Sequence, residues 1–325
     1  MEMKKTISIV IPTYNEEENV IPLHEEVVKM FSQSLPHHDY EILFIDNKST
    51  DSTRDKIRYL CSQNKNTRAI FNARNFGHTN SPYYGILSSG GDCAILMCAD
   101  FQDPVELVPK MVEEWENGFG IVCGVKTKSA ERKLMYFLRS TYYKLIKASS
   151  RVEQIEHFTG FGLYDRSFIQ VLRDLEEPIP FLRGLVAELG PDRKIIEYKQ
   201  EKRRSGKSKH SLYTLYDYAM LAFTSYTKFG LRIMSIGGFF LSVICLTVAF
   251  VYLVLKLTNW DDFPGGTAPI LIGLFTFSSI QLFFTGLLGE YIMSINSRVM
   301  NRPLVIEEER VGFEEEKGDK EDKEE

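Results

Sequence analysis

Short apolar runs alternate with amphipathic segments along the first part of the chain. The runs are rich in β-branched residues and end in polar turns, which predicts buried strands. We expect strands at Thr6–Ile11, Tyr40–Asp46, Arg68–Asn72, Cys93–Cys98 and Phe119–Val125. The segments between them predict helices at Glu17–Ser34, Asp51–Gln63, Pro82–Ser89 and Val105–Glu116. This alternation is typical of an α/β fold with a mostly parallel sheet, in which ligands bind at the carboxyl ends of the strands.

The rhythm changes after this region. We expect helices at Glu131–Ser149 and Leu182–Leu189, an irregular Gly-rich stretch at Thr159–Asp165, a strand at Ile195–Lys199 and a polar loop at Arg203–Lys209. The segment 211–230 has aromatic residues on one side. It fits an amphipathic helix in a membrane interface or a core helix of the preceding domain, and both interpretations stay open.

Two long runs without a charged residue follow. Ile233–Leu255 has 23 residues and Phe263–Gly289 has 27, and each can cross a hydrocarbon core of about 30 Å. We therefore expect transmembrane helices at 231–257 and 263–292 behind a cytoplasmic domain at 1–210. More positively charged residues lie before the first run and after the second than between the two runs. By the positive-inside rule, we expect both chain ends in the cytoplasm.

The acidic residues of the chain are concentrated near its C-terminus. The residues after position 306 include 11 acidic and 4 basic side chains, while the first 306 residues, with 35 basic and 33 acidic, are near neutral. The segment 303–325 is expected to be a disordered acidic tail, and a near-neutral body gives no reason to expect a nucleic-acid partner. The five cysteines form no CxxC pair, so neither a disulfide framework nor a zinc site is indicated.

Polar residues follow the first two predicted strands. They are Pro12, Tyr14, Glu16 and Asp46. Carboxylates at strand ends can accept hydrogen bonds from a base or a ribose, although a single one more often caps a helix. Asn15 and Asp51 are such capping candidates.

The segment Cys98–Pro104 suggests a metal site. Asp100 and Gln102 are two apart, and on an extended segment their side chains would point the same way. Oxygen ligands of this kind suit Mg²⁺ or Mn²⁺, which would hold a diphosphate. Asp103 is expected to cap a helix that has Pro104 at its first position.

A basic segment precedes the apolar runs. Lys194–Lys209 holds seven basic and two acidic residues. Such a segment can bind a phosphate or headgroup, or serve only as a solubilising patch. Gly206 and Ser208 within it favour a shaped phosphate loop.

Several of these motifs together resemble family 2 glycosyltransferases of the GT-A fold. They are Ile9–Pro12, Tyr14–Glu16, Asp46 with Ser49–Asp51, and Ala99–Pro104. Arg74–His78, Leu182–Gly184 and Arg203-x-x-Gly206-x-Ser208-Lys209 narrow the resemblance to bacterial polyprenyl-phosphate glycosyltransferases, relatives of dolichol-phosphate mannose synthase and bactoprenol glucosyltransferases. The resemblance covers residues 6–300. It implies a Rossmann-like GT-A domain with two membrane helices in the bacterial inner membrane. The implied reaction is a metal-assisted, inverting transfer of a hexose, by family habit from a UDP-sugar, to undecaprenyl phosphate for cell-envelope glycans.

The resemblance also implies roles for individual residues. Those implied for the nucleotide-sugar are Pro12, Tyr14, Glu16, Asp46, Arg74, Asp100 and Gln102. Asp100 and Gln102 would hold Mg²⁺ or Mn²⁺, and the acceptor phosphate would meet Arg183, Arg203, Ser208 and Lys209. The chain departs from the family pattern at Asn47 and Cys98, where acids are usual, and it lacks an Asp before Leu163–Arg166. Glu156 or His157 could substitute there as a catalytic group beside Asp100, and Asp165 is as readily structural.

Two other functions stay open. One is an enzyme of the same fold with a glycan acceptor. The other is a non-catalytic membrane scaffold, which Cys98 and Asn47 favour because they replace acids that are usual in the family. A nucleotide-dependent oxidoreductase is excluded because no G-x-G-x-x-G motif follows a strand. The identity of the sugar is not visible in the sequence, and a homo-oligomer is compatible with it.

Overall fold

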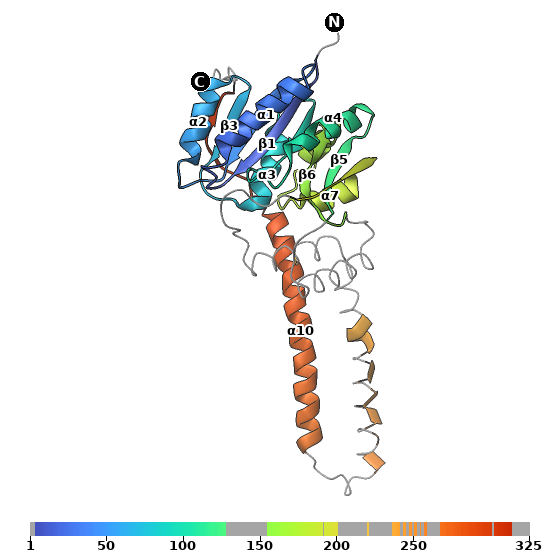
Figure 1. Cartoon of the computed structure of the whole chain (residues 1–325). Helices are drawn as coiled ribbons and strands as arrows, with labels where there is room; N and C mark the ends of the chain where they lie inside the picture. The colour runs from blue at the N-terminus through green and yellow to red at the C-terminus, as the bar shows by residue number, and fades with distance from the viewer. Residues whose placement is uncertain are drawn as a thin grey trace, which may run out of the picture. The chain divides into compact units, whose positions relative to one another are not determined.

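Figure 1 shows the computed structural model, which describes residues 4–127, 155–190, 192–200, 267–300 and 302–313, together with scattered positions between 220 and 258. The described residues belong to two compact units. The first unit contains all the described strands and includes the C-terminal residues 302–313, whereas the second contains the long helix α10.

An eight-stranded sheet forms the centre of the first unit, in the order β7-β5-β6-β4-β1-β2-β3-β8. The strands are β1 (Thr6–Thr13), β2 (Asp39–Asp46), β3 (Thr67–Asn72), β4 (Cys93–Leu96), β5 (Ile121–Lys126), β6 (Phe158–Asp165), β7 (Arg193–Tyr198) and β8 (Glu307–Val311). β1 pairs in parallel with β2 and β4, β2 with β3, and β5 with β7. β6 and β8 run antiparallel to their neighbours. The expected mostly parallel sheet is confirmed.

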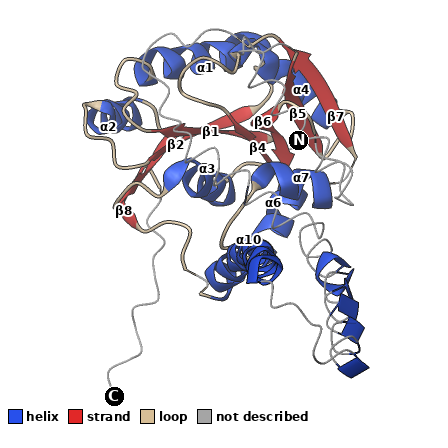
Figure 2. Ribbon diagram, turned by 90° about the horizontal axis from the view of Figure 1, so that it is seen from below, coloured by secondary structure: helices blue, strands red, loops and turns tan. Residues whose placement is uncertain are grey.

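Helices cover both faces of this sheet, as Figure 2 shows. One face carries α1 (Val20–Ser34), α2 (Thr53–Gln63) and α4 (Val108–Glu116), which follows the short 3₁₀ turn η1 (Val105–Leu107). The other carries α3 (Gly77–Ser88), α6 (Arg166–Asp174) and α7 (Leu182–Leu189). Successive strand residues point to opposite faces, so Ile9 joins the core under α1 while Val10 joins the core under α3.

The stretch 159–165, expected to be irregular, is instead the strand β6 between β4 and β5. Its glycines concealed the strand pattern, but Gly162 has a packing role. A Cβ at Gly162 would lie 2.6 Å from the Val122 backbone oxygen. Only glycine therefore allows this approach of β6 to β5. The remaining strands and helices expected within the described residues are present with shifted ends, and α6 is an additional helix.

The expected disordered acidic tail is wrong for its first part. Glu307–Val311 is β8, which pairs with β3, and Val305 before it is buried. Net charge misled the expectation because the acidic side chains meet basic partners from distant positions. Glu308 contacts Lys48 and Arg54, and Glu309 contacts Arg58. Residues 314–325 lie outside the described part.

The second unit is described mainly through α10, Thr267–Val299, a helix of 33 residues. Large apolar side chains are exposed along it, among them Ile270, Leu282, Phe283 and Ile292. Within the residues that the structure describes, no helix combines the length and the apolar character needed to cross a membrane. The expected span at 263–292 coincides largely with α10, and only scattered positions of the span at 231–257 are described. The expected helices at 131–149 and 211–230 lie outside the described residues, apart from the single position 220.

Candidate active site

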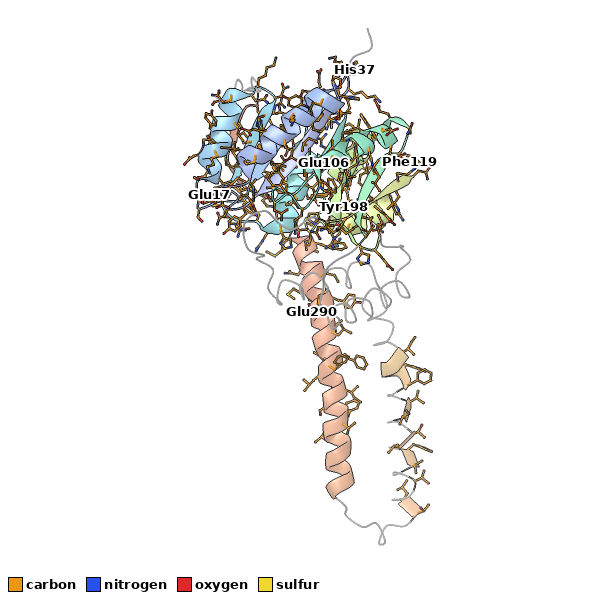
Figure 3. The ribbon with its side chains drawn as sticks, in the orientation of Figure 1. Glu17, His37, Glu106, Phe119, Tyr198 and Glu290 are labelled. Atoms are coloured by element: carbon orange, nitrogen blue, oxygen red, sulfur yellow. The ribbon has the colours of Figure 1, made fainter. Side chains whose placement is uncertain are left out.

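The chemistry-bearing residues gather at one edge of the sheet, where the parallel strands end. β6 and β8 run the other way, so their first residues lie at this same edge. In Figure 3, Glu17, after β1, and Tyr198, which ends β7, lie along one end of the first unit, and His37 lies at the opposite end. The edge thus brings together loops that are far apart in the chain.

Three residues in the loops after the parallel strands have an unusual backbone conformation, and His157, described below, is a fourth residue of this kind at the same edge. Asn15, Lys48 and Phe101 have φ of 56°, 66° and 60°, although none of them is glycine. They lie in the loops that follow β1, β2 and β4. Such conformations cost about 1–3 kcal/mol each and gather at functional sites. These conformations therefore make the three loops the candidate functional site.

The loops after β1 and β2 hold each other through side chains. Asn15 N–H donates to Ser49 Oγ at 2.8 Å, and Thr50 N–H donates to Asn15 Oδ1 at 2.8 Å. Glu16 N–H donates to Thr53 Oγ1 at 2.9 Å. Asn15 is therefore a bridge between the loops and not the helix cap that its sequence position suggested. Pro12, Tyr14 and Glu16 are half-buried along this bridge.

Asp46, which ends β2, is completely buried. Its carboxylate accepts hydrogen bonds from Ser49 N–H at 2.9 Å and Ser49 Oγ at 2.5 Å, and Arg54 Nε lies 3.3 Å away. Burial raises the pKa of Asp46, while the bonds from Ser49 and the charge of Arg54 oppose this shift. In this conformation Asp46 holds the β2 loop, and its direct contact with a base or ribose stays a prediction that requires the loop to move.

The segment 73–77, which runs from the end of β3 to the first residue of α3 and is called here the Arg74 loop, projects from the same edge. Arg74 is exposed, and its guanidinium carbon lies 4.5 Å from the centroid of the Phe76 ring. Asn47, which follows Asp46, bonds to three residues of this loop: Asn75, Phe76 and Gly77. An exposed guanidinium held in this way is suited to bind a phosphate group.

The segment after β4 forms a turn, so the expected extended geometry of Asp100 and Gln102 is wrong. Gln102 N–H donates to Asp100 Oδ1 at 3.1 Å, and Phe101 between them has the positive φ noted above. The turn keeps Asp100 nearly buried and Gln102 half-buried. Both residues remain at the carboxyl edge, where oxygen ligands would meet a diphosphate.

The sequence predicted that Asp103 caps the following helix, and this prediction is wrong. Its Oδ2 accepts from Cys98 N–H at 3.0 Å, and its Oδ1 accepts from Tyr198 Oη at 2.9 Å. Burial raises the pKa of Asp103, and the bond from Cys98 N–H and the charge of Lys126 oppose this. Asp103 therefore ties the turn after β4 to the end of β7.

Cys98, in the turn after β4, is exposed. Protein atoms nevertheless surround the thiol, since desolvation, followed by the charges of Asp103 and Asp100, raises its pKa well above the usual value. The thiol is protonated at neutral pH and makes a poor metal ligand in that state.

Glu156 and His157 lie at the same edge because β6 begins at the next residue. Both are exposed, His157 has φ of 61°, and its carbonyl accepts from Lys126 N–H at 3.5 Å. Arg183 of α7 reaches this place, with Nη1 donating to the Phe158 carbonyl at 3.5 Å. Arg203, Ser208 and Lys209 lie outside the described residues.

The architecture and these loops can be compared with known proteins. Residues 8–173 match the family model described as glycosyl transferase family 2. The chain belongs to this family. It is 32% identical to the putative glycosyltransferase CsbB of Bacillus subtilis over 91% of this chain and 89% of that protein. It is 29% identical to the SfII prophage-derived bactoprenol glucosyl transferase of Shigella flexneri, over 92% of this chain and 96% of that protein.

Among solved structures, the glucosyl-3-phosphoglycerate synthase of Mycobacterium tuberculosis is similar with a TM-score of 0.45 and 16% identity, over 68% of this chain and 76% of that chain.

In this glycosyltransferase, Asp165 has a structural role. It caps α6 by accepting from Ser167 N–H at 2.8 Å, and it accepts from Trp115 Nε1 at 2.7 Å. Burial alone would raise the pKa of Asp165, but the hydrogen bonds from Ser167 and Trp115 lower it below the usual value. Asp165 lies at the end of β6, at the edge opposite the site, so it cannot take part in chemistry there.

The family 2 enzyme also uses residues that sequence reasoning did not assign to the site. Asn47, Arg54 and Tyr198 hold the loops around it, although none belongs to a predicted binding set. Asn47 was noticed only as a departure from the family pattern. Within the described residues no three His, Cys, Asp or Glu side chains converge on a metal position. Asp100 with Gln102 fits only a cation that takes most of its ligands from a bound diphosphate and water, as Mg²⁺ commonly does.

Proposed function

We propose that this glycosyltransferase transfers a hexose from a UDP-sugar to the phosphate of a polyprenyl lipid, undecaprenyl phosphate, at the cytoplasmic face of a bacterial inner membrane. The observation that carries the proposal is the similarity to bactoprenol glucosyl transferases over more than nine tenths of the chain. The strained loops at the carboxyl edge support it, since they form a site of the kind that a nucleotide-sugar enzyme needs.

The donor would lie across the loops after β1, β2, β3 and β4. Tyr14 and Glu16 are placed to meet the base and ribose, and Arg74 to meet the diphosphate. Asp100 and Gln102 would hold Mg²⁺ or Mn²⁺, and this cation would neutralise charge on the departing diphosphate. The side chains themselves bind and orient the donor.

The acceptor phosphate is itself the nucleophile. One of its anionic oxygens attacks the anomeric carbon, the bond from that carbon to the diphosphate oxygen breaks, UDP leaves, and the configuration inverts. Because no proton needs to be removed, orientation and charge balance can supply most of the rate. Arg183, whose guanidinium reaches the Phe158 carbonyl at the site edge, would contact this phosphate. Arg203, Ser208 and Lys209 complete the proposed acceptor set, and Glu156 and His157 lie at the same edge.

Association with a membrane accounts for the exposed apolar side chains of α10. Soluble monomers rarely leave a large contiguous apolar surface in water, and the uncharged run Phe263–Gly289 lies mostly within this helix. We place these residues in the bilayer together with the run Ile233–Leu255, with both chain ends in the cytoplasm.

A radiolabelled transfer assay tests the function. Membranes containing the enzyme are incubated with a panel of labelled nucleotide-sugars, undecaprenyl phosphate and Mg²⁺, and then extracted with organic solvent. Label in the organic phase that depends on the added lipid phosphate is expected. Label confined to a water-soluble glycan would favour the glycan acceptor, and no turnover with any donor would favour the scaffold.

A further inference from the structure

Asn47 is the centre of a hydrogen-bond network that holds the Arg74 loop. Its Nδ2 donates to Asn75 Oδ1 at 2.9 Å and to the Gly77 carbonyl at 3.0 Å. Its Oδ1 accepts from Phe76 N–H at 2.8 Å and from Asn72 Nδ2 at 3.3 Å. A backbone N–H only donates and a carbonyl only accepts, so Phe76 and Gly77 determine which way the amide points.

A carboxylate can make only two of these four bonds. An ionised Asp at position 47 would keep the two acceptor bonds, but its second oxygen would face two other oxygens, those of Asn75 and Gly77. Asn47 is only 6% exposed, so water reaches the second oxygen poorly, and both the lost donor bonds and the repulsion between oxygens count against the acid. The amide is therefore matched to this loop.

The network decides where the Arg74 side chain projects. Ala73 N–H donates to the Ile306 carbonyl at 2.9 Å and anchors one end of the loop, and Asn47 anchors the other. Arg74 lies between the two anchors. Gly77, where α3 begins, has φ of +87°, a left-handed conformation that glycine adopts without a steric penalty, so the loop can turn sharply into the helix at this position.

We propose that Asn47 is a positioning residue whose amide, and not a carboxylate, holds the Arg74 loop in the conformation that receives the donor diphosphate. The proposal rests on the proposed function, because the diphosphate is that of the nucleotide-sugar. It turns a departure from the family pattern into a requirement of this chain: restoring the family's usual acid should impair the enzyme.

The full-length Asn47→Asp variant tests this through its pH dependence. UDP affinity with Mn²⁺ is measured by calorimetry between pH 5.5 and 8.5 and expressed relative to the wild type at each pH. At pH 8 we expect affinity about tenfold or more below the wild type, because two donor bonds are lost. Burial and the two facing oxygens should raise the pKa of the new carboxyl well above its usual value of about 4. As the pH falls within this range the carboxyl then gains a proton, can donate one bond again, and the ratio should move back toward one. Asn47→Ala should bind weakly at every pH without this recovery.

Hydrogen exchange supplies a readout that needs no nucleotide. The peptide covering residues 73–78 should exchange faster in Asn47→Asp than in the wild type at pH 8, and the difference should shrink near pH 6. The matched control is Asn117→Asp, the same chemical change at an exposed position after α4, which should leave both measurements unchanged.

The two readouts separate the possible failures. Wild-type affinity and unchanged loop exchange in Asn47→Asp at pH 8 would overturn the inference, and so would a deficit that stays constant across the pH range. A wild-type protein that binds no UDP while Asn47→Asp still loosens the loop would contradict the proposed donor and leave the hydrogen-bond role of Asn47 standing.

Discussion

Lys48 Nζ lies 2.8 Å from Glu308 Oε2, although 260 positions separate the two residues. The same carboxylate oxygen is 2.8 Å from Arg54 Nη2, and Arg54 in turn lies beside the buried Asp46. A chain of charges therefore connects the C-terminal strand β8 to the loop after β2. Hydrogen bonds from Lys48 and Arg54 lower the pKa of Glu308 to about 2, so it is ionised throughout the physiological range.

Replacing Glu308 by Ala should weaken donor binding without abolishing transfer. Lys48 and Arg54 would lose their shared partner, and the β2 loop would be held less firmly. Because exposed ion pairs contribute little, the KM for the donor should rise at most about fivefold, with kcat nearly unchanged. Steady-state kinetics at low and high salt check this, since the difference between variant and wild type should shrink as salt screens the pair.

Glu113→Ala supplies the control for that experiment. Glu113 is exposed on α4, away from β8, and its loss should not alter the KM or its salt dependence. An unchanged donor KM in Glu308→Ala at low salt would mean that β8 only covers the sheet edge.

Asp100→Asn should abolish divalent-dependent transfer, while Cys98→Ser should keep most of it. Asp100 is the only carboxylate assigned to the cation, and its loss removes charge that balances the leaving diphosphate, a loss on the order of 10²–10³-fold. Ser at position 98 can still donate to Asp103, as the thiol does now. Transfer rates with Mg²⁺, Mn²⁺ and EDTA decide the matter.

Two results would contradict this assignment. Activity of Asp100→Asn that persists in EDTA would exclude a metal-assisted reaction. Loss of activity in a folded Cys98→Ser protein would show that the sulfur itself is a ligand.

Arg203→Ala and Lys209→Ala should affect the acceptor and spare the donor. Each substitution removes a charge-assisted contact to the lipid phosphate worth about 1.5–3 kcal/mol. The KM for undecaprenyl phosphate should increase about tenfold or more, while UDP affinity measured by calorimetry stays unchanged. Lys65→Ala, an exposed lysine before β3, is the control. A fall in UDP affinity would place this basic loop in the donor site.

Stability should fall as the pH drops below about 6.5, partly through His24. His24 is buried with Nε2 2.8 Å from Thr67 Oγ1, and burial lowers its pKa, with Glu25 opposing. The unfolded chain therefore takes up a proton at a higher pH than the folded protein does, so protonation favours unfolding. His24→Gln should show a smaller loss of unfolding free energy between pH 7.5 and 5.5.

Urea denaturation followed by tryptophan fluorescence at the two pH values measures this difference. The exposed His37 provides the matched variant, His37→Gln, which should behave as the wild type does. Equal pH dependence in the wild type and His24→Gln would show that His24 does not contribute.

The sequence by itself determined the central architecture and the edge at which the chemistry lies. The period of the apolar residues predicted β1 to β5 and the helices between them, because burial of one face imposes that period locally. Parallel strands end at a common edge, so Glu16, Asp46 and Asp100 could be assigned to the same place before the structure was known.

Only the tertiary structure decided how that edge is held together. The strands β6 and β8, the Tyr198–Asp103 bond and the Lys48–Glu308 pair join residues that are far apart in the chain, and a local pattern does not reveal such partners. Asn47 shows the same limit most clearly. Its sequence position suggested a weakened site, whereas its four hydrogen bonds show an amide matched to its neighbours. Hydrogen-bond complementarity depends on the positions of donors and acceptors in space, and only folding sets those positions.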